Sequence, residues 1–225
     1  MNNLCVIFDL DGTLVDSEGL CNQAYLDLLP QLAQQGITLD QLLVRFRGRK
    51  FTLIIEELEQ MLGAPLSADF GPQYRDHVSY LFSTSLQPMP GVPEMLVQMQ
   101  VPYCIASSGP QFKIRDALTV TGLLPFFDGR IFSAYDVGSW KPDPGLFLHA
   151  AQAMGFAPSH CVVLEDSPVG VEAAQAAGMF ALQYLPAGHA VSAHPHATPF
   201  SDMRCLPDLL RQHANTLCEG VDLAP

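Results

Sequence analysis

Short apolar runs alternate along this chain with segments of helical spacing, and this alternation is the strongest constraint on its fold. Runs of four or five apolar residues rich in β-branched and aromatic side chains are typical of buried strands. Between them, apolar residues recur at positions that share one helical face, as at 146, 147, 150, 151 and 154. The alternation predicts an α/β fold, a parallel sheet with helices on both faces and its active site at the carboxyl ends of the strands. The expected strands are residues 4–8, 103–106, 130–133, 160–164 and 180–184.

A long helical segment interrupts the alternation after the first expected strand. It contains no convincing strand, and the simplest account is an inserted all-helical cap. We therefore expect a Rossmann-like core made of residues 1–14 and 86–225, with a small cap at 15–85. We expect a loop at 188–199, which is rich in His and Pro, and a last helix at 205–213. The helices expected in the cap are residues 21–32, 39–46, 52–62 and 74–83.

Two aspartates follow the first expected strand, in the run Phe8-Asp9-Leu10-Asp11-Gly12-Thr13. Two ionised carboxylates this close raise each other's pKa, so the pair requires either a divalent metal or a shared proton. The glycine allows a tight turn, and the threonine hydroxyl can cap the loop. An Asp-x-Asp-Gly turn is also common on protein surfaces, so a catalytic interpretation needs support from the rest of the chain.

Three later strands provide that support, because each is followed by polar residues. Ser107-Ser108-Gly109 follows the second strand and offers a hydroxyl and backbone N–H groups of the kind that bind phosphate oxygens. Lys141 follows the third strand, and Glu165-Asp166 follows the fourth. Each signal alone is usually a turn, a solvated side chain or a charge at a helix start. Together they bring carboxylates, a hydroxyl and a cation to one edge of the sheet, which predicts a single site.

This order of motifs resembles the haloacid dehalogenase-like hydrolase superfamily, and specifically its β-phosphoglucomutase-like branch with a small helical cap. The motifs cover nearly the whole chain. The resemblance implies that Asp9 attacks the phosphorus atom and forms an aspartyl-phosphate, which water then hydrolyses. It implies that Asp11 protonates the leaving oxygen and later deprotonates the water. Ser107 would hydrogen-bond the phosphoryl group, and Lys141 would neutralise charge on that group and on Asp9.

The same resemblance implies a Mg²⁺ cofactor. Its ligands would be the Asp9 carboxylate, the Asp11 backbone carbonyl and Asp166, with Glu165 bound directly or through water. Phosphoryl transfer needs cations around the equatorial oxygens of the phosphoryl group, and Mg²⁺ prefers oxygen ligands. Lys141 and Mg²⁺ would together supply this positive charge.

Asp11 also distinguishes between reactions within the superfamily. Haloacid dehalogenases are similar to this sequence elsewhere but lack an Asp at this position, because a halide leaving group needs no proton. The sequence therefore predicts a phosphatase that acts on small phosphorylated metabolites. A phosphosugar mutase uses the same core and remains an alternative. A non-catalytic phosphometabolite-binding module is a further alternative, which the complete set of site residues disfavours.

A basic cluster lies in the expected cap, where Arg45, Arg47, Arg49 and Lys50 surround Gly48 in a chain with only 11 Lys and Arg. A cap of this kind closes over the site and contacts the part of the substrate that leaves. The cluster is either a solvated helix end or the place where Arg47, with Arg49 or Lys50, meets an anionic group of the substrate.

Other stretches bear on the substrate. Phe46-Arg47-Gly48, residues 107–110 and residues 135–144 look like bacterial 6-phosphogluconate phosphatases of the same branch. Such a substrate carries a carboxylate as well as a phosphate, which a cap arginine would bind. Glu18, at the expected hinge of the cap, either binds sugar hydroxyls or faces solvent.

Charge and composition limit the partners. The formal net charge of −12 argues against nucleic acid and anionic membrane surfaces, which both require a cationic protein face. No stretch approaches the roughly 18 apolar residues of a membrane span. The six cysteines have no paired spacing, and Cys5, Cys104 and Cys161 lie inside apolar runs, so reduced core residues are expected. We expect a cytoplasmic monomer whose partner is a small phosphorylated substrate.

Overall fold

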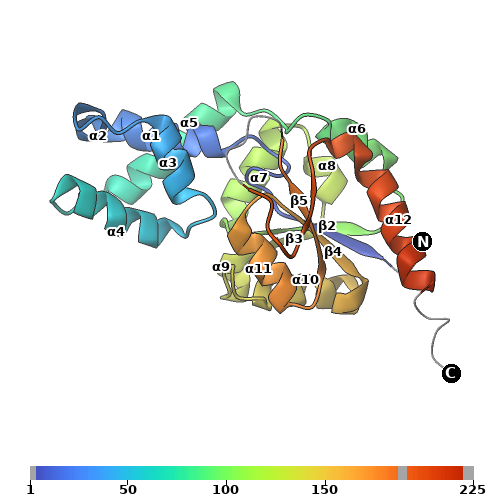
Figure 1. The fold of residues 1–225 in the computed structure, drawn as a ribbon. Helices are drawn as coiled ribbons and strands as arrows, with labels where there is room; N and C mark the ends of the chain where they lie inside the picture. Colours follow the sequence, from blue (N-terminus) through green and yellow to red (C-terminus); the bar gives the residue numbers. More distant parts are fainter. Residues whose placement is uncertain (1–3, 187–191, 220–225) are drawn as a thin grey trace.

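The centre of the fold is a six-stranded parallel sheet with the strand order β3-β2-β1-β4-β5-β6 (Figure 1). The computed structural model describes residues 4–186 and 192–219. The order reverses at β1, which lies between β2 and β4, and ligand sites of open α/β sheets form at the carboxyl ends of the strands near such a reversal. The predicted α/β class is confirmed. The strands are β1 (Cys5–Phe8), β2 (Tyr103–Ser107), β3 (Ile131–Ser133), β4 (Cys161–Glu165), β5 (Phe180–Tyr184) and β6 (Thr198–Phe200).

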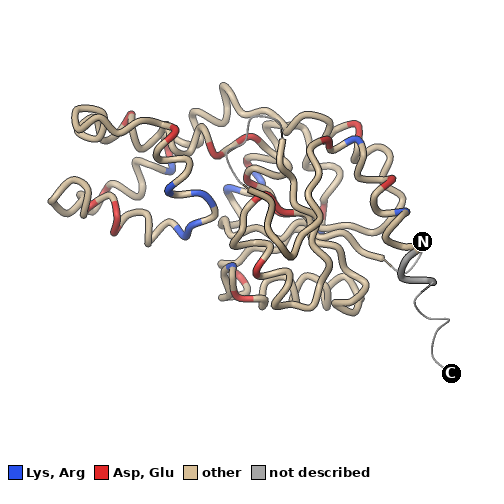
Figure 2. Tube along the Cα trace, viewed as in Figure 1, with Lys and Arg blue, Asp and Glu red and all other residues tan. Residues whose placement is uncertain are grey.

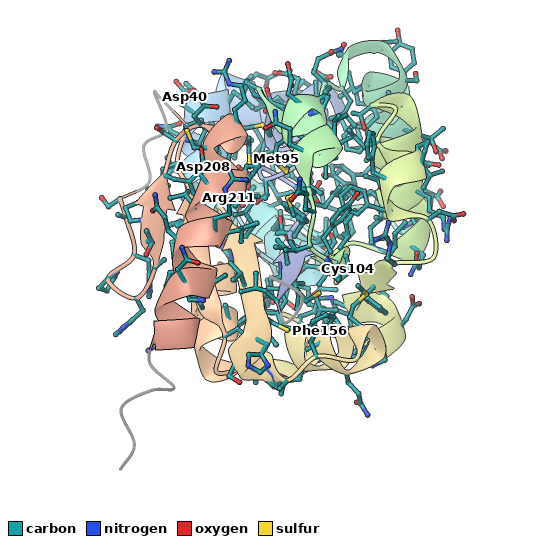
Figure 3. The ribbon with its side chains drawn as sticks, turned by 90° about the vertical axis from the view of Figure 1, so that its right-hand side faces the viewer. Asp40, Met95, Cys104, Phe156, Asp208 and Arg211 are labelled. Atoms are coloured by element: carbon teal, nitrogen blue, oxygen red, sulfur yellow. The ribbon has the colours of Figure 1, made fainter. Side chains whose placement is uncertain are left out.

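Alternate strand residues face two separate apolar layers, because successive side chains of a strand point to opposite faces. Val6 and Phe8 belong to one layer, and Cys5 and Ile7 to the other. Figure 3 shows helices on both sides of the sheet, and Met95 belongs to the first layer. The first layer is covered by α6 (Val92–Gln98), α7 (Gln111–Val120), α8 (Leu124–Phe127) and α12 (Leu206–Glu219), and the second by α9 (Ala134–Val137), α10 (Gly145–Met154) and α11 (Pro168–Ala176).

Residues 18–85 form five helices that extend to one side of the sheet (Figure 1). They enclose a third apolar cluster, in which Tyr25, Leu42, Phe46 and Leu58 are buried. A capping box begins the helix at residues 39–46: the Thr38 hydroxyl accepts from the Gln41 N–H at 3.3 Å. The helices are α1 (Glu18–Leu28), α2 (Pro30–Gln34), α3 (Leu39–Phe46), α4 (Phe51–Leu62) and α5 (Phe70–Ser85).

Two expectations about secondary structure were wrong. The helix expected at 21–32 is divided into α1 and α2 at Leu29, because a proline at position 30 cannot donate a helical hydrogen bond. The loop expected at 188–199 extends only to residue 197 within the described residues, because Thr198–Phe200 pairs with β5 as the edge strand β6. Residues 188–191 of that loop lie outside the described part. Among the described residues, no helix has the length and apolar character needed to cross a membrane.

Candidate active site

Asp9 follows β1 directly and is almost completely buried, with 7% of its surface exposed. Its backbone N–H donates to the Leu164 carbonyl at 2.9 Å, which fixes the chain at the end of the strand. Lys141 Nζ lies 2.5 Å from Asp9 Oδ1 and 2.5 Å from Glu165 Oε1. Burial raises the pKa of Asp9 well above its usual range, and Glu165 raises it further although Lys141 opposes the effect. The ammonium group therefore holds the carboxylate in place at a position that strongly favours a nearby cation.

Asp9, Glu165 and Asp166 form a buried acidic cluster whose ligand atoms all lie within 4.8 Å of one another. Burial is the main reason why the pKa of Asp166 is raised well above its usual range, and Glu18 and Glu165 add to it. Gly12 permits this approach, because a Cβ there would lie 2.6 Å from Asp166 Oδ2 and its φ is +81°. The cluster offers hard oxygen donors at a site short of positive charge, so it fits a divalent cation such as Mg²⁺.

The Glu165 carboxylate organises the loop before α11. Its Oε2 accepts from the Asp166 N–H at 3.1 Å, from the Ser167 N–H at 3.0 Å and from Ser167 Oγ at 2.9 Å. Ser167 in turn caps α11, since its Oγ accepts from the Gly170 N–H at 3.1 Å. Gly170 leaves room for the carboxylate, because a Cβ there would lie 1.9 Å from Glu165 Oε1. Glu165 is therefore a positioning group for Lys141 and the loop.

Asp11 is held apart from the acidic cluster by two partners that the sequence did not indicate. Lys113 Nζ, from the first turn of α7, lies 3.0 Å from both carboxylate oxygens, and Ser17 Oγ donates to Oδ1 at 2.5 Å. Burial raises the pKa of Asp11, but the charge of Lys113 and the hydrogen bond from Ser17 outweigh it and leave the pKa lowered. No local pattern of residues marks Lys113 for this contact.

Ser107 ends β2, the strand next to β1, and is buried. Its Oγ accepts from the Gly109 N–H at 3.1 Å, so its hydroxyl hydrogen is available to donate to a phosphoryl oxygen. Ser133 Oγ donates to the Gly109 carbonyl at 2.7 Å and fixes the loop against the end of β3. Ser108 and Gly109 line the adjoining cavity.

A cavity of about 410 Å³ lies between the helical segment and the ends of the strands. Figure 2 shows a basic stretch between α3 and α4 that faces the sheet domain. Lys50 Nζ lies 3.9 Å from the centre of the Trp140 ring, and a Cβ on Gly48 would lie 3.2 Å from Ser167 Cβ. The loop between α3 and α4 therefore contacts the core through Trp140, which follows α9, and Ser167, which follows β4.

Arg47 and Glu18 are paired with each other at the edge of this cavity. Arg47 Nη2 lies 2.6 Å from Glu18 Oε2, and Nη1 lies 3.4 Å from Asp166 Oδ2. Burial raises the pKa of Glu18 to about 7, although Arg47 opposes the shift. Glu18 lines the cavity, whereas Arg47 is not among the described residues that do so. The structure thus places Arg47 on two carboxylates of the protein.

Comparisons with known proteins agree with this geometry. A family model described as haloacid dehalogenase-like hydrolase matches residues 4–178. The chain is 35% identical over 208 residues to the 6-phosphogluconate phosphatase of Escherichia coli (strain K12), covering 91% of this chain and 93% of the relative.

Two solved structures are also similar. A haloacid dehalogenase-like protein of unknown function from Agrobacterium tumefaciens has a TM-score of 0.80 and 32% identity, covering 95% of this chain and 100% of the other. A Thermotoga maritima protein assigned as a β-phosphoglucomutase has a TM-score of 0.73 and 26% identity, covering 93% and 99%.

Proposed function

Because the chain belongs to the haloacid dehalogenase-like hydrolases and is a phosphatase of phosphorylated metabolites, we propose that its substrates are sugar and sugar-acid phosphates. 6-Phosphogluconate is the first candidate, because the E. coli relative that covers almost the whole chain is a phosphatase of that name. We further propose that the reaction depends on Mg²⁺ and passes through an aspartyl-phosphate on Asp9.

One observation carries this proposal: the two aspartates of the motif have opposite surroundings. Asp9 is buried against Lys141 and two other carboxylates, whereas Asp11 is paired with Lys113 and faces the cavity. These different surroundings support divided roles. We assign the nucleophile to Asp9, which Lys141 holds inside the acidic cluster, and proton transfer to and from the leaving oxygen to Asp11, which lies outside that cluster beside Lys113.

The other side chains act on the phosphoryl group. An oxygen of Asp9 attacks the phosphorus atom while the P–O bond to the leaving group breaks. Asp11 supplies the proton that the leaving-group oxygen takes up. Lys141 favours the ionised form of Asp9 and orients its carboxylate, and the Ser107 hydroxyl donates to a phosphoryl oxygen. Asp11 then removes a proton from the water that cleaves the aspartyl-phosphate.

We propose that Asp9, Asp166 and the Asp11 carbonyl would hold Mg²⁺, with Glu165 acting through water because both of its oxygens already accept hydrogen bonds. When bound, the ion would supply positive charge to the phosphoryl oxygens and to the acidic cluster.

Residues 15–85 are proposed as a cap over this site, and residues 1–14 and 86–225 as the catalytic core. The separate apolar cluster of the helical segment and the cavity lined from both sides support this division. Arg47 is proposed to bind an anionic group of the substrate. To do so, its guanidinium must break its ion pairs with Glu18 and Asp166 or bind the substrate in addition to them.

Phosphate release from a panel of sugar, sugar-acid and other metabolite phosphates tests the proposal. With Mg²⁺ the protein should release phosphate, and Asp9→Asn and Asp11→Asn should each reduce kcat by at least about 10³-fold. Asp128→Asn, an exposed carboxylate away from the cavity, is the matched control and should retain activity. An isomerised product without phosphate release would favour the mutase, and no turnover across the panel would refute the hydrolase.

A further inference from the structure

Five cationic side chains line the cavity, and four of them have partners. Lys141 and Lys113 hold the catalytic aspartates, and Lys50 lies over Trp140. Arg49 is paired with Glu57. The fifth, Arg75, is exposed and has no hydrogen-bond, ion-pair or ring partner within the part of the chain that the structure describes. It is therefore the cavity cation whose charge the described protein leaves unmatched.

Arg75 lies on the face of α5 that lines the cavity. Tyr74, Val78, Ser79 and Phe82 line the cavity from the same helix, so two apolar side chains and two that carry a hydroxyl lie near Arg75. A substrate that displaces water from this wall would lower the local dielectric constant and strengthen the attraction between the guanidinium and a carboxylate.

The place of Arg75 along α5 sets its distance from the reacting groups. Phe82 marks the catalytic end of the helix, because Lys113 Nζ lies 5.9 Å from the centre of its ring. Arg75 is seven residues earlier, which corresponds to about 10 Å along a helix. Gly71 leaves space for the guanidinium, whose Nη1 would lie 3.6 Å from a Cβ at that position. In this structure the guanidinium is therefore directed toward Gly71, away from Phe82, and another rotamer of this exposed side chain is needed to direct it toward the catalytic end.

We propose that Arg75 is a specificity-determining residue that binds a carboxylate at the end of the substrate distant from the phosphate. An extended six-carbon sugar-acid phosphate spans about 8 to 9 Å from phosphorus to carboxyl carbon, at about 1.2 Å per bond of an extended chain. This length matches the separation of Arg75 from the catalytic end of α5. The planar guanidinium can bind both carboxylate oxygens, which an ammonium cannot do. The inference rests on the proposed function and names the group that selects among its substrates.

A matched substrate pair tests the role of Arg75. 6-Phosphogluconate and sorbitol 6-phosphate are open-chain phosphates that differ at C1, where the first has a carboxylate and the second a hydroxymethyl group. Arg75→Ala should raise KM for 6-phosphogluconate about tenfold, and at least five times more than for sorbitol 6-phosphate, with kcat little changed. Arg75→Lys should recover part of the loss. Arg115→Ala, an exposed arginine of α7 outside the cavity, should leave both substrates unaffected.

Three outcomes would overturn the inference. The first is an equal effect of Arg75→Ala on both substrates. The second is a carboxylate-selective loss in Arg47→Ala with none in Arg75→Ala. The third is that Asp116→Asn, which removes a carboxylate of α7 that lines the same cavity, reproduces the carboxylate-selective rise in KM of Arg75→Ala. In each case Mg²⁺-dependent phosphate release by the unaltered protein would continue, so the proposed function would stand. Failure to hydrolyse either substrate would instead remove both proposals.

Discussion

Gly170 offers a sharp test of how Glu165 positions the site. In Gly170→Ala the new Cβ would lie 1.9 Å from both Cδ and Oε1 of Glu165, far inside the 3.4 Å at which ordinary contact begins. The carboxylate would have to move by about 1.5 Å, because the helix backbone of α11 is held by the Ser167 cap. That displacement would lengthen the 2.5 Å contact with Lys141 beyond hydrogen-bond distance.

The expected cost has a structural and a catalytic part. Overpacking costs about 1 to 3 kcal/mol, and loss of a charge-assisted hydrogen bond about 1.5 to 3 kcal/mol. The combined loss of about 2.5 to 6 kcal/mol corresponds to a fall in Tm of about 5 to 24 °C in a protein of this size. Because Lys141 orients the nucleophile, a shift of about 1 Å should reduce kcat on the order of 100-fold.

Thermal unfolding and steady-state phosphate release measure the two parts separately. Gly19→Ala is the control, since that glycine lies in α1 with nothing within 4 Å of the added Cβ. It should leave kcat unchanged and stabilise the protein slightly, by about 0.5 kcal/mol. If Gly170→Ala keeps both its Tm and its kcat close to those of the unaltered protein, Glu165 does not position Lys141 as described.

Two further predictions follow from the charges of the site. Lys113→Met should lower kcat about 10- to 100-fold with a smaller change in KM, because Asp11 loses the ammonium that lies 3.0 Å from both of its oxygens. Lys113→Arg should recover part of the rate. An unchanged kcat in Lys113→Met would exclude a positioning role for Lys113. In EDTA, Tm should fall between pH 5 and pH 7, because the raised pKa values of Asp9, Asp166 and Glu18 mean that the folded protein binds more protons than the unfolded chain in this window. Added Mg²⁺ should raise Tm more at pH 7 than at pH 5, and a metal-free Tm that rises over this window would contradict the assignment.

The sequence was most informative where a polar site residue lies at the end of an apolar strand. Asp9 and Glu165-Asp166 come at the ends of apolar runs, so parallel pairing alone brings them to one edge. The edge strand β6 gave no such signal, because Thr198–Phe200 is short, half-exposed and contains a proline. It becomes a strand only through its pairing with β5.

Contacts made by side chains of helices were harder to predict. Lys113 reaches Asp11 only because of the rotation of α7 relative to the sheet, which no local pattern of residues specifies. The sequence marked Arg47 only as part of a basic cluster, and its partners Glu18 and Asp166 depend on how the helical segment packs. Whether it also binds substrate stays a prediction.

The position of β1 between β2 and β4 affects the order in which parts of the protein fold during synthesis. β1 pairs with β4, and the paired residues, such as Cys5 and Cys161, lie far apart in the sequence. The apolar cluster of α1 to α5 instead draws on residues close together in the chain, and such local contacts form sooner than distant ones. During synthesis from the N-terminus, the helical segment can therefore condense while Asp9 still lacks Lys141, Glu165 and Asp166. The nascent chain acquires its substrate-facing helices first and gains catalytic power only after the ribosome has passed β4.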